Sequence, residues 1–470
     1  MNKFVNVMMT EDSKTYNGAI TNSTSFNACL DLFFLAGACR KESDKNIISK
    51  LSAAYQEDRV KCLKIIFWAG DIRQGAGERR FFKLALNGLN KNHKEDIQDY
   101  LAWIPEMSRW DVLFELVDNK IVFSYILSVL LDKTYKGYPL LCKWLPRKNQ
   151  HNNLAHKIQK ALNINAKLYR KMIVEGTKVV EQQMCSKKWN EIEYSKVPSV
   201  AMNKYNKAWY RNDQDRFEKY LEEVRQGKSK INASAIFPHD IIKSAIKPGW
   251  YTTYELNEAK ILQWNSLPNY LEGKANSIIP VCDVSGSMEC NHYLPISISI
   301  ALGLYISERN EGPFKDAFIT FSARPVMQYL KGDINARVEQ LARSKWGSNT
   351  NLTAVFDLIL KKAVDNHLHD CDIPKTVLVI SDMEFDYCGE MTNFNYIKKA
   401  FETYGYTLPQ IVFWNVNGRV GNVPVKMNDE GVALISGASP SLLKAVLTNE
   451  IHPIKMMNSV IETERYNFIR

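Results

Sequence analysis

The sequence lacks long apolar runs and paired cysteine motifs. None of its apolar runs reaches the ~18 residues that a membrane-spanning helix needs. Its first residues, MNKFVNVMMTEDSK, lack the apolar core of a signal peptide. Its nine cysteines are odd in number and never stand in a CxxC spacing, which is typical of reduced, mostly buried thiols. We therefore expect a cytoplasmic protein without a membrane partner, or a virion-associated one if the chain is viral.

Acidic residues are scarce in one part of the chain. No aspartate or glutamate lies between Leu141 and Lys171, and residues 141–220 hold 17 Lys and Arg against 7 Asp and Glu. Residues 1–270 hold 42 basic and 29 acidic residues, whereas residues 271–470 hold 19 and 22. This asymmetry favours a polyanion as partner of the first part. The alternative is a surface whose charge serves only its solvation.

The length and the spacing of apolar residues predict two kinds of domain. The 470 residues exceed one ordinary core. Between residues 25 and 270, apolar side chains recur at i, i+3, i+4 and i+7, as on one face of a helix. Five segments show this spacing: ACLDLFFLAGACR, RVKCLKIIFWAGDIR, RRFFKLALNGL, DVLFELVDNKIVFSYILSVLLDK and RFEKYLEEVRQG. Successive helices with short breaks predict an irregular, HEAT-like helical solenoid over residues 25–270, after a segment of residues 1–24.

Short strands alternate with helices beyond residue 276. The strand-like runs are SIIPVCDVS, DAFITFSA, KTVLVISDM, QIVFWNVNG and GVALISG, and amphipathic segments such as NLTAVFDLILKKAVDN separate them. This alternation predicts a doubly wound, mostly parallel sheet, which makes the chain a multidomain α and α/β protein. A ligand site of such a sheet lies at the carboxyl ends of its strands. We therefore expect an α/β domain over residues 276–470 with a site at that edge.

Short oxygen-bearing side chains follow the first of these strands. Asp283, Ser285 and Ser287 come directly after it, Asp382 follows another strand, and Thr350 stands just before a helix. Hard cations such as Mg²⁺ prefer oxygen ligands and keep several waters. Because the three loops meet at one sheet edge, the sequence predicts that these five side chains converge on one divalent cation.

The order of these residues resembles the metal-ion-dependent adhesion site of a von Willebrand factor A domain. The resemblance implies that Ser285, Ser287 and Thr350 bind Mg²⁺ or another divalent cation directly. It implies that Asp283 and Asp382 bind directly or through water, and that an open position accepts an acidic oxygen from a partner. One departure is Asn351, where related domains often have an aspartate.

The helical part resembles the Ro autoantigen (TROVE) family, and most closely its bacterial, plant and viral relatives. The segments that carry the resemblance are STSFNACLDLFFLAGACR, DIRQGAGERRFF, KWLPRKN, VPSVAMNKYNKAW, KINASAIFPHDII and, near the C-terminus, GVALISGASPSLLKAVL. In that family the helical repeats form a ring, closed by the A domain, whose basic hole and outer face accept RNA. The resemblance implies a monomeric ring of this kind and a ribonucleoprotein function.

Basic residues within the acid-poor region are the candidates for RNA contact, because single strands bind in positive grooves that also offer aromatic side chains. Trp144, Trp189 and Trp209 stand among them, but large aromatic side chains of helical stacks are usually core residues. The predicted RNA-binding residues are Lys143, Arg147, Lys148, His151, Lys157, Arg170, Lys187, Lys188, Lys204, Lys207 and Arg211.

Three functions remain open at this point. We expect a non-enzymatic protein that binds single-stranded or structured RNA and carries a Mg²⁺-dependent ligand site. The alternative is a protein scaffold without RNA, in which the metal site docks an acidic partner. A Mg²⁺-dependent phosphohydrolase would need a general base, and His292 is the nearest histidine in sequence to the serine motif. It would also need further carboxylates, for which Glu384 and Asp386 are candidates.

Overall fold

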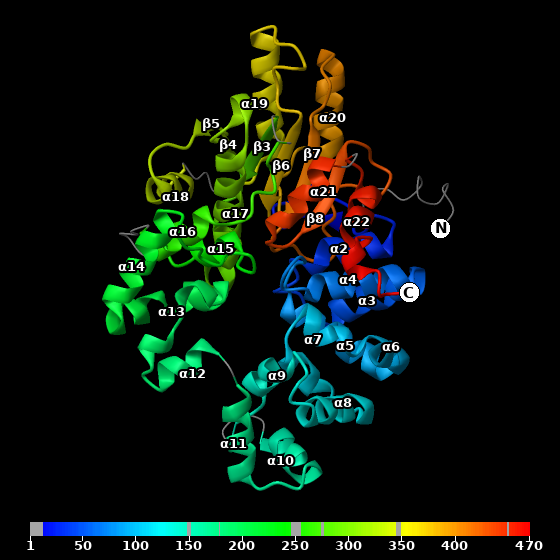
Figure 1. Ribbon diagram of the computed structural model, residues 1–470. Helices are drawn as coiled ribbons and strands as arrows, with labels where there is room; N and C mark the ends of the chain where they lie inside the picture. The colour runs from blue at the N-terminus through cyan, green and yellow to red at the C-terminus, as the bar shows by residue number, and fades with distance from the viewer. Residues whose placement is uncertain are drawn as a thin grey trace. The chain divides into compact units, whose positions relative to one another are not determined.

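The computed structural model describes residues 13–147, 152–177, 179–245, 255–273, 277–344, 349–448 and 451–470 (Figure 1). The described residues pack into two compact units. We call the first the sheet unit; it comprises residues up to 69, 74–78 and residues from 236 onward. We call the second the helical unit; it comprises residues 70–73 and 79–235.

The sheet unit contains a six-stranded sheet in the order β5-β4-β3-β6-β7-β8. All neighbouring strands are parallel except β5, which is antiparallel to β4 at the edge. This arrangement confirms the predicted doubly wound, mostly parallel sheet. The strands are β3 (Ile278–Cys282), β4 (Ala317–Thr320), β5 (Met327–Tyr329), β6 (Thr376–Ser381), β7 (Gln410–Asn415) and β8 (Val432–Ser436).

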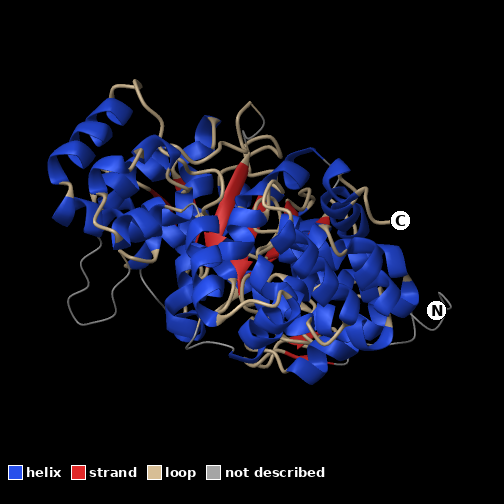
Figure 2. Ribbon diagram, turned by 60° about the horizontal axis from the view of Figure 1, so that its bottom comes forward, coloured by secondary structure: helices blue, strands red, loops and turns tan. Residues whose placement is uncertain are grey.

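Helices enclose the inner strands, as Figure 2 shows for the strands in red. Every residue of β3, β6 and β8 is buried, which explains why these strands appear in the sequence as continuous apolar runs. The helices that follow β3 in the sheet unit are α17 (Cys290–Arg309), α18 (Ile334–Ala342), α19 (Leu352–Asp365), α20 (Asn393–Tyr404), α21 (Leu443–Thr448) and α22 (Pro453–Ile461).

Segments from the predicted helical domain also pack in the sheet unit. Helix α2 (Ala28–Ala36) lies against β8, where the Gly37 amide donates to Ser436 Oγ (3.0 Å). At the end of the neighbouring strand β7, Asn415 Nδ2 donates to the Phe34 carbonyl (3.1 Å). Eight of the nine residues of α2 are buried. Apart from Asp31, whose carboxylate bonds to Ser25 and Lys50, the helix is apolar on all sides, and such a helix lies within a core. Here β8 and neighbouring helices of the sheet unit form that core. The other elements of this group are α3 (Asp44–Glu57), α4 (Arg59–Gly70, whose last residue belongs to the helical unit), α15 (Pro238–Ile242) and α16 (Glu258–Asn265). The sheet unit also includes β1 (Ser13–Lys14) and β2 (Ile20–Thr21) from the predicted N-terminal segment.

The helical unit consists of short helices that pack on their chain neighbours, as expected of stacked helices. Contacts join α5 to α6, α8 to α9 and α13 to α14. No helix in the described ranges is long and apolar enough to cross a membrane. The α-helices are α5 (Arg79–Asn92), α6 (Lys94–Tyr100), α7 (Trp103–Met107), α8 (Lys120–Leu131), α9 (Tyr138–Trp144), α10 (Asn152–Ala161), α11 (Ala166–Gly176), α12 (Val180–Cys185), α13 (Ser199–Asn212) and α14 (Gln214–Arg225).

We expect Gly303→Ala to destabilise the sheet unit. Gly303 lies on α17, and a methyl group there would overlap Cys282 Sγ at the end of β3. Such overpacking costs about 1–3 kcal/mol. Calorimetry should show a lower melting temperature for Gly303→Ala and partial recovery in the double variant Cys282→Ala/Gly303→Ala. Gly286→Ala, where no atom lies within 4 Å of the new methyl group, is the control. Equal melting of Gly303→Ala and wild type would contradict this packing.

Candidate cation and nucleic-acid sites

The predicted oxygen ligands lie where the strand order of the sheet reverses. Strand β3 has β4 on one side and β6 on the other, and the chain builds the sheet outward in both directions from this point. Sheets of this kind bind ligands at the carboxyl ends of the strands beside such a reversal. Asp283 directly follows β3, and Asp382 directly follows β6. The pairing of these two strands therefore places both aspartates at one position on the sheet edge.

Hydrogen bonds hold the serine motif against β6. The Asp283 amide donates to the Ile380 carbonyl (3.1 Å), and Ser381 Oγ donates to Asp283 Oδ2 (2.6 Å). The other carboxylate oxygen of Asp283 accepts from the Ser285 amide (2.9 Å). Ser285 Oγ lies 3.1 Å from Ser287 Oγ, and the Ser287 hydroxyl also interacts with the Asp382 carboxylate. The structure thus brings Asp283, Ser285, Ser287 and Asp382 together.

Thr350 joins this group through the loop that follows β6. Thr350 Oγ1 donates to the Glu384 carbonyl (2.6 Å), and the Asp386 amide donates to the Thr350 carbonyl (2.9 Å). The Glu384 amide in turn donates to Asp382 Oδ1 (3.2 Å). Asn351, the departure from the family pattern, is the N-cap of α19 and accepts from the Ala354 amide (2.9 Å). Its side chain is therefore engaged in starting that helix.

The two aspartates are buried without a positive partner. Asp283 is 0% and Asp382 is 3% exposed, and neither forms an ion pair with another described residue. Burial raises the pKa of Asp283. Burial, followed by the negative charge of Asp283, raises the pKa of Asp382 to about 7. A divalent cation would relieve this repulsion, because it stabilises both carboxylates in their charged form.

The donor set fits a hard cation. Two carboxylates and three hydroxyls offer only oxygen, which is the ligand type that Mg²⁺ prefers. In the part of the chain that the structure describes, no group of three or more His, Cys, Asp or Glu side chains could hold a metal ion. Any cation at this edge therefore depends on the hydroxyl groups of Ser285, Ser287 and Thr350 as well as on the aspartates.

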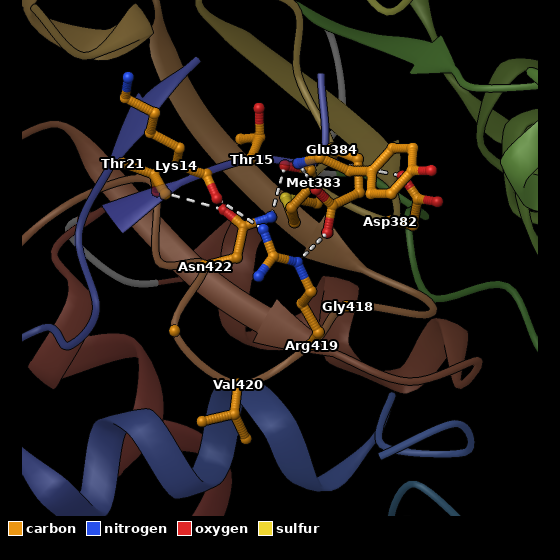
Figure 3. A network of polar contacts seen from close by, with 12 residues as sticks. Lys14, Thr15, Thr21, Asp382, Met383, Glu384, Gly418, Arg419, Val420 and Asn422 are labelled. Atoms are coloured by element: carbon orange, nitrogen blue, oxygen red, sulfur yellow. Dashed lines mark hydrogen bonds and ion pairs between the residues drawn. The ribbon is translucent and has the colours of Figure 1, made fainter. Parts of the chain in front are cut away.

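The N-terminal segment lies beside this group, a feature that the sequence analysis missed. Arg419 Nε bonds to the Glu384 carboxylate (2.8 Å), and Arg419 Nη2 donates to the Lys14 carbonyl (2.6 Å; Figure 3). The Glu384 carboxylate also accepts from the Tyr16 amide. Asn17 Nδ2 donates to Thr350 Oγ1 (2.9 Å). No spacing in the sequence signals the contacts of Lys14, Tyr16 and Asn17, because more than 300 residues separate each of them from its partner.

The predicted RNA-binding residues fall into three groups. Lys148 and His151 lie outside the described residues. Lys143, Lys157 and Lys188 each pair with an acidic side chain, Glu181, Asp118 and Glu191 respectively. The remaining six are exposed and form no ion pair with another described residue: Arg147, Arg170, Lys187, Lys204, Lys207 and Arg211.

Helix α13 carries three of these unpaired residues on one face. Lys204, Lys207 and Arg211 stand at i, i+3 and i+7, a spacing that aligns side chains along a helix. We call these three residues the α13 basic stripe. On the opposite side of the same helix, Trp209 is 0% exposed and packs against Tyr194 and Phe217.

The aromatic side chains near the basic residues are mostly engaged within the helical unit. Trp209 is a core residue, as expected for a large aromatic in a helical stack. Trp144 is half-buried, and the Arg109 guanidinium lies 3.4 Å from the centre of its ring. Trp189 is also half-buried. Near these basic residues the exposed side chains therefore offer mainly positive charge, and these three tryptophans offer little exposed ring surface for stacking with bases.

We expect Asp382→Asn to stabilise the protein in the absence of divalent cations. The folded-state pKa of Asp382, about 7, lies above the ordinary 3.8. Its protonation stabilises the fold fully below pH ~4, and this contribution is lost as the pH rises through ~7. Calorimetry in EDTA should show the melting temperature of the variant exceeding that of wild type by more at pH 8 than at pH 5. The change is about 2–4 °C for each kcal/mol of repulsion removed. A difference that does not grow with pH would contradict the burial of two adjacent carboxylates.

The chain is similar to a viral protein over nearly its whole length. The chain is 28% identical over 508 residues to the uncharacterized protein L728 of Acanthamoeba polyphaga mimivirus, covering 96% of this chain and 87% of the relative. The sequence analysis also expected relatives in viruses.

Two solved structures show weak similarity. The Ro (RSR) protein of Deinococcus radiodurans gives a TM-score of 0.37 at 12% identity, with 93% of this chain and 99% of that chain covered. The proximal thread matrix protein 1 of the mussel byssus gives 0.24 at 14% identity, with 50% and 64% covered.

Two families match consecutive parts of the chain. Residues 277–466 match a domain of unknown function, DUF7788. Residues 15–110 and 126–276 match another domain of unknown function, DUF2828. The two matches meet where the spacing of apolar residues changes from helical to alternating. Because the second match covers more than half of the 470 residues, the chain belongs to the DUF2828 family.

Proposed function

We propose that this protein is a non-enzymatic RNA-binding protein whose helical unit holds single-stranded or structured RNA on its basic surface. The observation that carries this proposal is the α13 basic stripe. Its three cations are exposed, lie on one helix face and have no acidic partner among the described residues. Over the seven residues from Lys204 to Arg211 the helix rises about 10 Å, which lets the stripe contact more than one phosphate of a nucleic-acid strand.

The charge of the surrounding chain supports the same partner. Residues 141–220 hold ten more basic than acidic residues, and Arg170 on α11 and Lys187 after α12 are exposed without an ion pair among the described residues. Unpaired surface cations gain little within a folded chain, whereas phosphate contacts release counterions and supply most of the affinity for nucleic acid. The resemblance to the Ro family adds RNA as the expected polyanion.

We further propose that Asp283, Ser285, Ser287, Thr350 and Asp382 hold Mg²⁺ or another divalent cation. A cation there would supply a positive charge that attracts an acidic oxygen from a partner. The protein's own groups hold the ligands in place, because Ser381 orients Asp283 and the Glu384 amide orients Asp382. This cluster also favours the alternative of a protein scaffold, in which an acidic protein partner docks at the cation without RNA.

An enzymatic function has weaker support. Glu384, a candidate for a second metal, directs its carboxylate to Arg419 and the Tyr16 amide instead of to Asp382. His292 stands in the left-handed region of backbone space at the start of α17 with its side chain exposed. Neither residue is placed as a general base beside the two aspartates, so we propose binding and not turnover.

We expect charge reversal of the α13 basic stripe to weaken RNA binding. The triple variant Lys204→Glu/Lys207→Glu/Arg211→Glu should lose about tenfold or more in affinity for a single-stranded RNA at 100 mM salt, and the dependence of affinity on salt should become shallower. Filter binding across salt concentrations measures both effects.

The matched control for this experiment is Lys361→Glu/Lys362→Glu/Lys399→Glu. It reverses three exposed charges on α19 and α20 of the sheet unit. Equal losses in the two triple variants would show that net charge, and not this helix face, governs binding. Wild-type protein that retains no RNA at ~50 mM salt would favour the scaffold.

We expect Ser285→Ala to weaken binding of a divalent cation. The substitution removes one hydroxyl ligand while the Ser285 amide can still donate to Asp283. Titration calorimetry with Mn²⁺ should show an affinity at least about tenfold lower than that of wild type. Ser266→Ala, which removes an exposed hydroxyl after α16, is the control. Unchanged Mn²⁺ affinity in Ser285→Ala would remove this serine from the site.

A further inference from the structure

A tight turn of the N-terminal segment stands beside the candidate cation ligands. The turn joins β1 to β2, and its Gly18 has a φ of +86° and an amide that donates to the Thr15 carbonyl (3.1 Å). Thr15 Oγ1, which is buried, donates to the Phe385 carbonyl (2.6 Å). Arg419 Nη2 donates to the carbonyl of Lys14, the last residue of β1 (Figure 3). The turn is therefore anchored to the loop that carries Asp382.

Further contacts fix the return strand of this turn. Thr21 Oγ1 donates to the Val423 carbonyl (3.0 Å), and Asn422 Nδ2 donates to the Met383 carbonyl (2.8 Å). Figure 3 shows Thr21 and Asn422 joined beside Met383. Because both ends of the turn are tied to the sheet unit, its tip has a defined position.

Asn17, at the tip of the turn, engages the hydroxyl group of a predicted ligand. Its Nδ2 donates to Thr350 Oγ1 (2.9 Å) and to the Glu384 carbonyl (2.7 Å). Thr350 Oγ1 itself donates to the same carbonyl (2.6 Å). A hydroxyl has one proton and two lone pairs. With the proton given to Glu384 and one lone pair facing Asn17, one lone pair of Thr350 remains for a cation.

We infer that Asn17 is a positioning residue of the cation site: it fixes the rotation of the Thr350 hydroxyl so that its last lone pair faces the ion. The inference rests on the proposed cation site. Without the Asn17 amide, the Thr350 hydroxyl could also turn its proton toward Asp386 Oδ1, which lies 3.3 Å away. Groups that orient a metal ligand in this way commonly contribute ten- to a hundredfold to metal affinity.

This role extends the site beyond the residues that match DUF7788. Thr350 and both aspartates lie within residues 277–466, whereas Asn17 lies within the DUF2828 match. The complete site thus draws on both families, and the residue that orients Thr350 stands 333 positions before it in the chain.

The test measures Mn²⁺ affinity of full-length variants by titration calorimetry and the Mn²⁺ resonance by electron paramagnetic resonance. We expect Asn17→Ala to bind Mn²⁺ about tenfold more weakly than wild type and to alter the line shape of the bound ion. Asn17→Leu, which keeps the size but has no donor, should show the same loss. Tyr16→Ala changes a neighbouring side chain that is 89% exposed, and it should bind like wild type.

A double-variant cycle separates orientation from a general effect. In a Thr350→Ala background, the further change Asn17→Ala should cost less than about twofold, because the hydroxyl that it orients is absent. An equal loss in both backgrounds would overturn the inference, as would wild-type affinity in Asn17→Ala and Asn17→Leu. Wild-type protein that binds no Mn²⁺ would overturn the proposed cation site instead. Melting temperatures in EDTA within about 2 °C of wild type show that the variants fold.

Discussion

Two buried carboxylates at adjacent strand ends are the constraint around which the sheet edge is built. Asp283 and Asp382 follow β3 and β6, two buried strands that pair in parallel at the centre of the sheet. No described basic side chain reaches either of them. Asp283 accepts from the Ser285 amide and interacts with the hydroxyl groups of Ser381 and Ser285. Asp382 accepts from the Glu384 amide and interacts with the Ser287 hydroxyl. These hydrogen bonds offset part of the burial, and the remaining negative charge is what makes the edge suited to a cation.

Much of this edge follows from local sequence. The continuous apolar runs predict buried parallel strands, and strand-end aspartates and serines predict where a ligand binds. Local sequence could not predict the contact of Asn17 with Thr350, because it depends on a turn that packs against a loop 333 residues away. Arg419 and Ser381 were missed for a similar reason: what they bond to is decided by tertiary packing and not by their spacing.

The assignment of helices to domains shows the same division between local and tertiary information. Helical spacing located α2 in the sequence but did not place it in the sheet unit. The composition ACLDLFFLA, apolar except for Asp31, was the available signal, since a helix in a solenoid keeps a polar face. In the helical unit, charge composition found the acid-poor region. Only the structure separated Lys143, paired with Glu181, from Lys204, which has no acidic partner among the described residues.

The packing of α2 against β8 has a consequence for the order in which the chain can fold. Gly37 and Phe34 bond to residues about 400 and 380 positions later. At a synthesis rate of about 5–20 residues per second, α2 leaves the ribosome roughly 20–80 s before its partner strand exists. During that interval α3 and α4, which follow α2 directly, can cover only the part of the helix that packs on them. The face of α2 that β8 covers therefore stays without its native partner until the strands near the C-terminus have been synthesised.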